Sequence, residues 1–135
     1  MIKVFTDGGA RGNPGPAASA FVVYKEGNEI HKESKYLGET TNNVAEYRGV
    51  IIALNWIKNN LKSEDINFFL DSELVVKQLK GIYKIKNENL LALAIEIKSL
   101  EQELGSVITY ANIPRVKNKL ADKLVNIELD SRRGK

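Results

Sequence analysis

Apolar residues in roughly the first forty positions of the chain occur in short runs or alternate with polar ones, which is typical of β-strands. The runs at residues 2–7, 17–25 and 29–37 predict three strands. Glu26-Gly27-Asn28 is a turn sequence short enough to join the last two as a hairpin. A longer loop, rich in glycine and proline, is expected from Gly8 to Pro16. The chain therefore opens with three antiparallel strands in a meander.

Beyond this region the spacing of apolar residues becomes helical. A helix over about residues 43–60 is predicted, with Thr40-Thr41-Asn42 available to cap it. Its apolar positions recur at helical spacing: Val44, Tyr47, Ile51, Leu54 and Ile57. Glu46 falls on the same inward face, where a solvated surface charge is not expected. The remaining pattern predicts a strand at 65–71, a short helix at 72–79, a longer helix at 88–104 ending before Gly105, a strand at 106–111 and a helix from about Asn118, its candidate cap, to Leu129.

The order of these elements, βββ-α-β-α-α-β-α, defines the expected fold class. It is an α/β fold with a five-stranded mixed sheet, made of three antiparallel strands followed by two helix-linked strands, with helices on both faces. A length of 135 residues with 43% hydrophobic and 27% charged residues fits one globular domain. We expect the domain to span residues 1–130, with a basic tail at 131–135.

Composition restricts the chemistry and the location. The chain has no cysteine and a single histidine, His31, which excludes disulfides, thiolate zinc sites and cysteine nucleophiles. We interpret His31 as a surface residue of an edge strand. Any metal site must therefore use oxygen ligands, which favours magnesium or manganese. No apolar run has the length of a membrane span or of a signal peptide, so we expect a cytoplasmic protein without a membrane partner. We also expect a monomer.

Four acidic residues stand where a carboxylate is hard to explain structurally. Asp7 and Asp71 each end an apolar strand-like run, Glu46 lies among apolar neighbours, and Asp122 lies on the last predicted helix. If the two strands are neighbours, about 4.8 Å apart, their terminal carboxylates can share a metal. Mutual repulsion would make such a cluster unstable without multivalent cations. The pattern indicates a metal-dependent hydrolase, although each acid taken alone could be a surface or capping carboxylate.

Four segments of the sequence, each containing or ending on one of these acids, carry a family resemblance: residues 5–16, 40–46, 70–72 and 113–122. Together, and in this order, they resemble type 1 ribonuclease H. The resemblance implies a ribonuclease H-like fold and hydrolysis of the RNA strand of RNA–DNA hybrids with two Mg²⁺ ions, Mn²⁺ being an alternative. It also implies that Asp7 bridges the ions, that Glu46 and Asp71 hold one, and that Asp122 helps to hold the other.

The resemblance further implies substrate contacts at Gly8, Arg11, Asn13, Thr41 and Asn42. Asn13 and Asn42 match positions that contact the hybrid, and Thr41 matches one near a phosphate of the DNA strand. Glycines let a backbone approach a sugar–phosphate surface, and an amide side chain can sense a 2′-hydroxyl. A proline-fixed turn explains the same loop without a substrate, and Asn43 suits either a substrate contact or the first turn of a helix.

The sequence also departs from the family. The loop at residues 112–117 lacks the histidine that many members carry there, and Arg115 is our candidate for a catalytic cationic substitute, the alternative being an exposed arginine after a proline. Glu73 replaces a glutamine that contacts substrate. The connection at residues 79–87 is too short for a basic handle helix, and no room remains for an accessory hybrid-binding domain. We therefore expect weaker binding than in longer members, although a net charge of +3 suits a polyanionic partner.

Two other functions compete with this prediction. A non-catalytic nucleic-acid-binding module could share the fold, but a binder of polyanions gains nothing from clustered negative charge. Another metal-dependent nuclease of the fold, such as a 3′–5′ exonuclease or a junction resolvase, is the second alternative. The Thr41-Asn42-Asn43 and Asn13-Pro14-Gly15 segments favour ribonuclease H. Activity on double-stranded RNA stays open.

Overall fold

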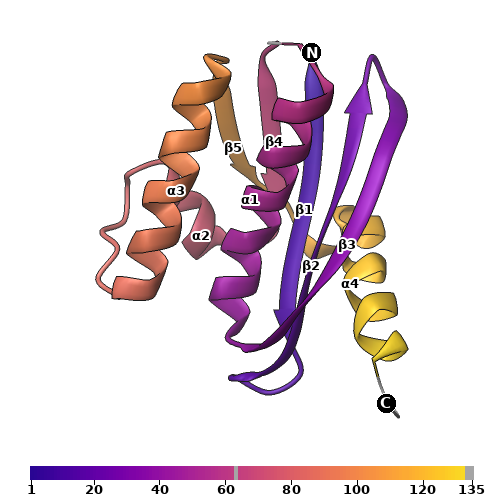
Figure 1. Ribbon diagram of the computed structural model, residues 1–135, viewed down its shortest axis with the longest axis vertical. Coiled ribbons are helices and arrows are strands. Elements are labelled where there is room, and N and C mark those ends of the chain that lie inside the picture. The colour runs from indigo at the N-terminus through magenta and orange to yellow at the C-terminus, as the bar shows by residue number, and fades with distance from the viewer. Residues whose placement is uncertain (63, 133–135) are drawn as a thin grey trace.

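The computed structural model of the chain describes residues 1–62 and 64–132. Its elements, in chain order, are β1 (Ile2–Ala10), β2 (Gly15–Lys25), β3 (Asn28–Thr40), α1 (Asn42–Asn60), β4 (Ile66–Leu70), α2 (Glu73–Leu79), α3 (Glu88–Leu104), β5 (Ile108–Asn112), a single 3₁₀ turn η1 (Arg115–Lys117) and α4 (Lys119–Ser131) (Figure 1). The element order predicted from the sequence is thus confirmed. No helix within this described part is long and apolar enough to cross a bilayer.

The strands form one mixed sheet in the order β3-β2-β1-β4-β5. Strands β1, β2 and β3 are antiparallel, whereas β4 runs parallel to both β1 and β5. The parallel register joins Phe5 to Phe69. Asp7 and Asp71 each follow two residues after this pair, so the parallel pairing brings the two acids to the same edge of the sheet. The predicted fold class and the predicted neighbourhood of the two strands are both confirmed.

Helices cover both faces of the sheet, as predicted (Figure 1). Helices α1, α2 and α3 lie on one face, where their apolar side chains join those of the sheet in the main core, including Phe21, Tyr47 and Phe68. Helix α4 packs on the other face across β1, β2 and β3, and its Val125 and Leu129 form a smaller cluster with alanines of β2. Asp7 therefore belongs to a strand that is packed on both sides.

The glycine- and proline-rich loop is shorter than predicted. Residues 8–10 continue β1 and pair with residues 17–19 of β2, because residues with small side chains can still form a regular backbone ladder. Only residues 11–14 lie outside the two strands, with a cis peptide bond between Asn13 and Pro14. Asp7 consequently lies inside β1, not at its end, and the prediction that it terminates a strand was wrong.

Several boundary predictions agree with local chemistry. The Thr41 hydroxyl caps α1 by accepting the backbone N–H of Val44 at 3.2 Å, and Gly105 ends α3 in the left-handed conformation. Glu26 and Gly27, both with positive φ, form the β2–β3 hairpin turn. The connection between α2 and α3 contains no helix, which agrees with the absence of a basic handle.

The predicted basic tail begins within α4, and His31 lies at the edge of the sheet. Ser131 still belongs to α4, one residue past the predicted domain boundary, and residues 133–135 lie outside the described residues. His31 does lie on the edge strand β3, as predicted. Its ring stacks on Trp56 with centroids 4.2 Å apart, and its Nε2 lies 3.0 Å from a Glu33 carboxylate oxygen.

Two glycines allow α1 to lie unusually close to β1. A Cβ atom at Gly8 would stand 2.2 Å from the backbone carbonyl carbon of Ala45, so no side chain fits there. At Gly49, one turn further along α1, a Cβ would stand 3.1 Å from the carbonyl oxygen of Asp7. The helix therefore meets the strand through backbone atoms on either side of Glu46.

Gly8→Ala should destabilise the protein, whereas Gly9→Ala should not. The added Cβ at position 8 meets helix backbone, which cannot give way as a side chain can, and overpacking costs about 1–3 kcal/mol of the free energy of unfolding. At position 9 the nearest atom is a side-chain carbon of Val125 at 3.8 Å, an ordinary contact, and the change should stay within about 1 kcal/mol. Urea denaturation of both variants measures the difference; equal stabilities would contradict the close packing of α1.

Candidate active site

Three of the four predicted acids meet beside the α1–β1 contact. Asp7 comes from β1, Glu46 from α1 and Asp71 directly follows β4. One carboxylate oxygen from each lies within 4.8 Å of the others. Asp7 and Glu46 are buried, with 4% and 6% of their surface exposed, and Asp71 is half-buried. Such a cluster of hard oxygen donors is the ligand type that Mg²⁺ and Mn²⁺ prefer.

The two oxygens of Glu46 have different surroundings. Oε1 accepts the backbone N–H of Gly8 at 3.1 Å, which holds the carboxylate in place. Oε2 is buried and has no hydrogen-bond partner among the described residues. A buried carboxylate oxygen without a donor is costly unless a cation balances it. The three acids therefore fit a divalent metal ion.

Burial also perturbs the protonation of these acids. Desolvation, together with the nearby charges of Asp71 and Asp122, raises the pKa of Asp7 from 3.8 to about 7 despite the opposing hydrogen bonds. Burial, followed by the charge of Asp7, holds the pKa of Glu46 well above its usual range. Without a cation, the cluster therefore retains protons that isolated carboxyl groups would release. A cation would favour the ionised form and reverse the effect.

Asp122 borders the cluster without joining it. It lies in the first turn of α4 and lines the same cleft, of about 350 Å³, as Asp7, Glu46 and Asp71. Its side chain is 36% exposed, and its Oδ1 stands 3.9 Å from Nη2 of Arg115. Arg115 belongs to η1 and its side chain is 78% exposed on the rim of the cleft. The structure thus brings all four acids and Arg115 to one cleft, with three acids close enough to share an ion.

Asn118 has a place in this site that the sequence did not reveal. We predicted it as a helix cap, and it does occupy the N-cap position of α4, but its side chain makes no capping hydrogen bond. Its buried Nδ2 instead donates to the backbone carbonyl of Thr6 at 2.8 Å and to Oδ2 of Asp71 at 3.1 Å. Asn118 therefore ties the start of α4 to β1 and orients one of the three clustered acids.

The predicted substrate contacts divide between two hollows. Gly8, Arg11 and Asn42 line the acidic cleft. Asn13 and Thr41 line a neighbouring cavity, also of about 350 Å³, between the N-termini of α1 and α3. Asn42 and Asn43 border both hollows, so the two form one continuous stretch of surface. Glu73 lines neither of these hollows and pairs with Lys77 at 2.9 Å.

Each of these predicted contacts also supports the fold. The Asn13 side-chain oxygen accepts the backbone N–H of Asn42 at 3.0 Å, and the Asn42 side-chain oxygen accepts that of Ala10 at 2.7 Å. Nη1 of Arg11 pairs with Asp130 of α4 at 2.7 Å. The turn between β1 and β2 is thereby joined to both α1 and α4. The side chains of Arg11, Asn13 and Asn42 are thereby held in position at the border of the cleft.

Comparison with known proteins agrees with this arrangement. A family model described as reverse transcriptase-like matches residues 5–127. The crystal structure of LC11-RNase H1 in complex with an RNA/DNA hybrid superposes with a TM-score of 0.92 and 42% identity, covering 97% of this chain and 98% of that one. The chain belongs to the type 1 ribonuclease H family. Members of this family are metal-dependent, in keeping with the carboxylate cluster.

Curated relatives extend the comparison. Ribonuclease HI of Halobacterium salinarum is 33% identical over 130 residues, which cover 96% of this chain and 64% of that protein. The bifunctional protein Rv2228c of Mycobacterium tuberculosis is 39% identical over 132 residues, which cover 96% of this chain and 36% of that protein. The chain thus spans about a third of the length of the latter relative, so similarity is limited to a ribonuclease H-like part of it.

The raised pKa values predict how stability depends on pH without metal. Unfolded Asp7 ionises near 3.8 and folded Asp7 near 7, so the folded state binds more protons between these values. The free energy of unfolding should therefore fall as the pH rises through this window. Asp7→Asn should flatten this fall, and magnesium should raise the melting temperature more above pH 7 than below pH 5. Melting curves in chelator and in magnesium across this range test the prediction; a parent protein that becomes more stable with rising pH in chelator would contradict it.

Proposed function

We propose that this chain is an endoribonuclease that hydrolyses the RNA strand of RNA–DNA hybrids with two magnesium ions. The observation that carries the proposal is the cluster of Asp7, Glu46 and Asp71 on the floor of a cleft that Asp122 and Arg115 also line. The family membership supports it, and one relative of 42% identity forms a complex with an RNA/DNA hybrid. A nucleic-acid phosphate would approach these carboxylates only with cations between them.

The four acids take different parts in this proposal. Asp7, the central acid on β1, would be a ligand of the metal ions. Glu46 and Asp71 would hold an ion beside it, Glu46 through its unpartnered Oε2 and Asp71 through a carboxylate that Asn118 orients. Asp122, whose side chain is 36% exposed, would supply a ligand for the second ion. Two bound ions would supply an activated water and charge stabilisation at the leaving oxygen. Manganese suits the same ligands.

Arg115 is proposed to contact the scissile phosphate or the product phosphate. Its side chain is 78% exposed, and its one ion-pair partner in the described residues, Asp122, is 3.9 Å away, which makes a weak surface pair. The side chain is therefore free to turn toward a phosphate in the cleft. A planar guanidinium can offer two parallel hydrogen bonds to phosphate oxygens.

Selection of the substrate is proposed to depend on the sugar–phosphate backbone. Gly8, Arg11, Asn13, Thr41 and Asn42 surround the cleft and the neighbouring cavity. Amide and backbone groups at such positions can contact 2′-hydroxyls and phosphates, which carry no sequence information. The enzyme should therefore accept hybrids of varied sequence.

The central test compares nucleic acids as substrates. With magnesium, the purified protein should cut the RNA strand of labelled hybrids of several sequences and leave DNA duplexes intact. Asp7→Asn should abolish cleavage while retaining the fold, because it removes the central ligand without changing side-chain volume. A circular dichroism spectrum of the variant is the control for folding. Turnover by Asp7→Asn equal to the parent would refute the metal site, and efficient cutting of DNA duplex would assign another nuclease activity.

Arg115→Ala should slow hydrolysis without unfolding the protein. Removing one charged group that stabilises transition-state charge costs about 2–4 kcal/mol in the activation free energy. Arg115→Lys should recover part of the rate, because an ammonium cannot reproduce the two-pronged contact. Arg48→Ala, at an exposed arginine of α1 that does not line the acidic cleft, is the matched control. Rates for Arg115→Ala within about twofold of the Arg48→Ala rate, far below the expected loss, would assign Arg115 to the solvated surface.

A further inference from the structure

A further cavity, of about 310 Å³, lies on the α4 side of the sheet and is separate from the acidic cleft and from the cavity beside Asn13 and Thr41. Residues of four segments line it: Lys3, Phe5, Val22, Tyr24, Gly27, Lys117, Asn118, Leu120 and Ala121. It exists because α4 covers only part of this face, packing on β1, β2 and β3. Its volume is at the lower end of the range of about 300–1,000 Å³ for small-ligand pockets.

Two aromatic rings, those of Phe5 and Tyr24, form the floor of this cavity, and the ring of Phe69 adjoins Phe5 outside its lining. Phe5 of β1 makes an edge-on contact with Tyr24 of β2, with ring centroids 5.6 Å apart, and stacks on Phe69 of β4 at 4.9 Å. All three are half-buried, so a row of rings across three neighbouring strands stays partly open to solvent. Aromatic rings on an open sheet face are the surface on which unpaired nucleic-acid bases stack.

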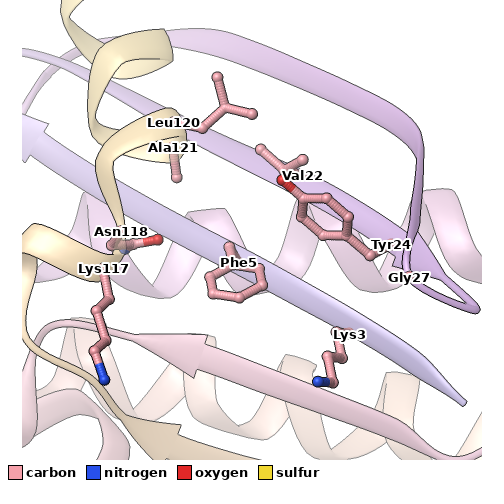
Figure 2. Close-up of a pocket in the computed structure, with 9 residues that line it drawn as sticks. All are labelled: Lys3, Phe5, Val22, Tyr24, Gly27, Lys117, Asn118, Leu120 and Ala121. Carbon is pink, nitrogen blue, oxygen red and sulfur yellow. The ribbon is translucent and has the colours of Figure 1, made fainter.

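Positive charge lies at both ends of this floor. Figure 2 shows Phe5 between Lys117, at the end of η1 just before α4, and Lys3, on β1. Both lysines are exposed, and no ion pair joins either to a carboxylate within the described chain. No aspartate or glutamate lines the cavity. The wall therefore attracts anions, in contrast to the acidic cleft.

The inner wall contains a buried polar group. Asn118 is 1% exposed, and Figure 2 shows its side-chain oxygen turned toward the cavity. This Oδ1 is buried and has no hydrogen-bond partner among the described residues, while Nδ2 of the same amide is bound to Thr6 and Asp71. Asn118 therefore closes the inner wall, and the rings and the lysines supply the surface that a ligand can reach.

We propose that this cavity binds an unpaired single strand of nucleic acid, with one base on the Phe5 floor and a phosphate at each lysine. The two lysines favour a strand over a free nucleotide, because only a strand carries a phosphate on both sides of a base. The site would hold a single-stranded segment next to the hybrid that occupies the acidic cleft. It is a binding site distinct from the metal ligands.

The test uses metal-free protein labelled with ¹⁵N and an oligothymidylate of about six nucleotides, within the site sizes of single-strand binders. DNA of this kind should shift the backbone amide signals of Lys3, Phe5, Gly27 and Leu120 in a saturable way. Phe5→Leu and Lys3→Glu should each weaken this binding about tenfold, the size of one lost stacking contact or one lost phosphate contact. Lys35→Glu, an equal charge change at an exposed position of β3 outside the cavity, should bind as the parent does.

Three outcomes would overturn the proposal. Shifts confined to residues of the acidic cleft would place the strand there. Equal affinity of Lys3→Glu and Lys35→Glu would show that only net charge matters. Thymidine monophosphate binding as tightly as the oligothymidylate would identify a free-nucleotide site. Lys3→Glu should meanwhile keep the parent rate on blunt hybrids, so failure of this proposal is distinguishable from failure of the hydrolase function.

Discussion

The candidate site depends on the close contact between α1 and β1. Because Gly8 and Gly49 have no side chains, helix backbone lies directly against strand backbone, and Glu46 between them reaches Asp7. The same contact removes both carboxylates from water and raises their pKa values. Burial of like charges is unfavourable in the folded protein alone. The carboxylate cluster therefore destabilises the metal-free protein, and a bound cation would remove this repulsion. Cation binding should thus increase the free energy of unfolding.

The parallel pairing of β1 with β4 and the start of α4 supply the rest of the site. Asp71 follows β4 at the level of Asp7, and Asn118 binds both Asp71 and the carbonyl of Thr6. Asp122 comes one helical turn after Asn118 and donates its backbone N–H to the Asn118 carbonyl at 3.1 Å. One asparagine thus sets the position of two acids, one by a side-chain contact and the other through the helix that it begins.

Local sequence patterns predicted the elements well because each reports on neighbours along the chain. Alternating and helical apolar spacing gave the order of strands and helices, and the Thr41 cap and the Gly105 stop were visible as local motifs. The four acids could be picked out because Asp7 and Asp71 each end an apolar run, Glu46 lies among apolar neighbours, and Asp122 lies on the last predicted helix. The extension of β1 past Asp7 was missed because glycine is normally a sign of a loop, and the residues that pair with Gly8, Gly9 and Ala10 lie beyond the turn, at Ser19, Ala18 and Ala17.

Functions of side chains that act over long sequence separations were not predictable. Asn118 looked like an ordinary helix cap, and its contacts with Thr6 and Asp71 span separations of 112 and 47 residues. Gly8 was predicted as a loop glycine that approaches substrate, and the structure adds that its missing side chain makes room for α1. In both cases the sequence drew attention to the correct residue, but part of its role depends on a contact with an element far away in the chain. Only the three-dimensional structure shows that contact.

The buried and exposed halves of the cleft differ in how much the fold determines them. Glu46 and Asp71 are held by hydrogen bonds from Gly8 and Asn118, so the three-acid cluster is positioned before any ligand arrives. Asp122 is half-buried and Arg115 is exposed, and the two are joined by one weak pair at 3.9 Å. Under the proposed function, the fold fixes the first ion position, whereas the second ion and the phosphate compete with solvent for Asp122 and Arg115. Substrate binding would then complete the site, which links the weak Asp122–Arg115 pair to catalysis and not to stability.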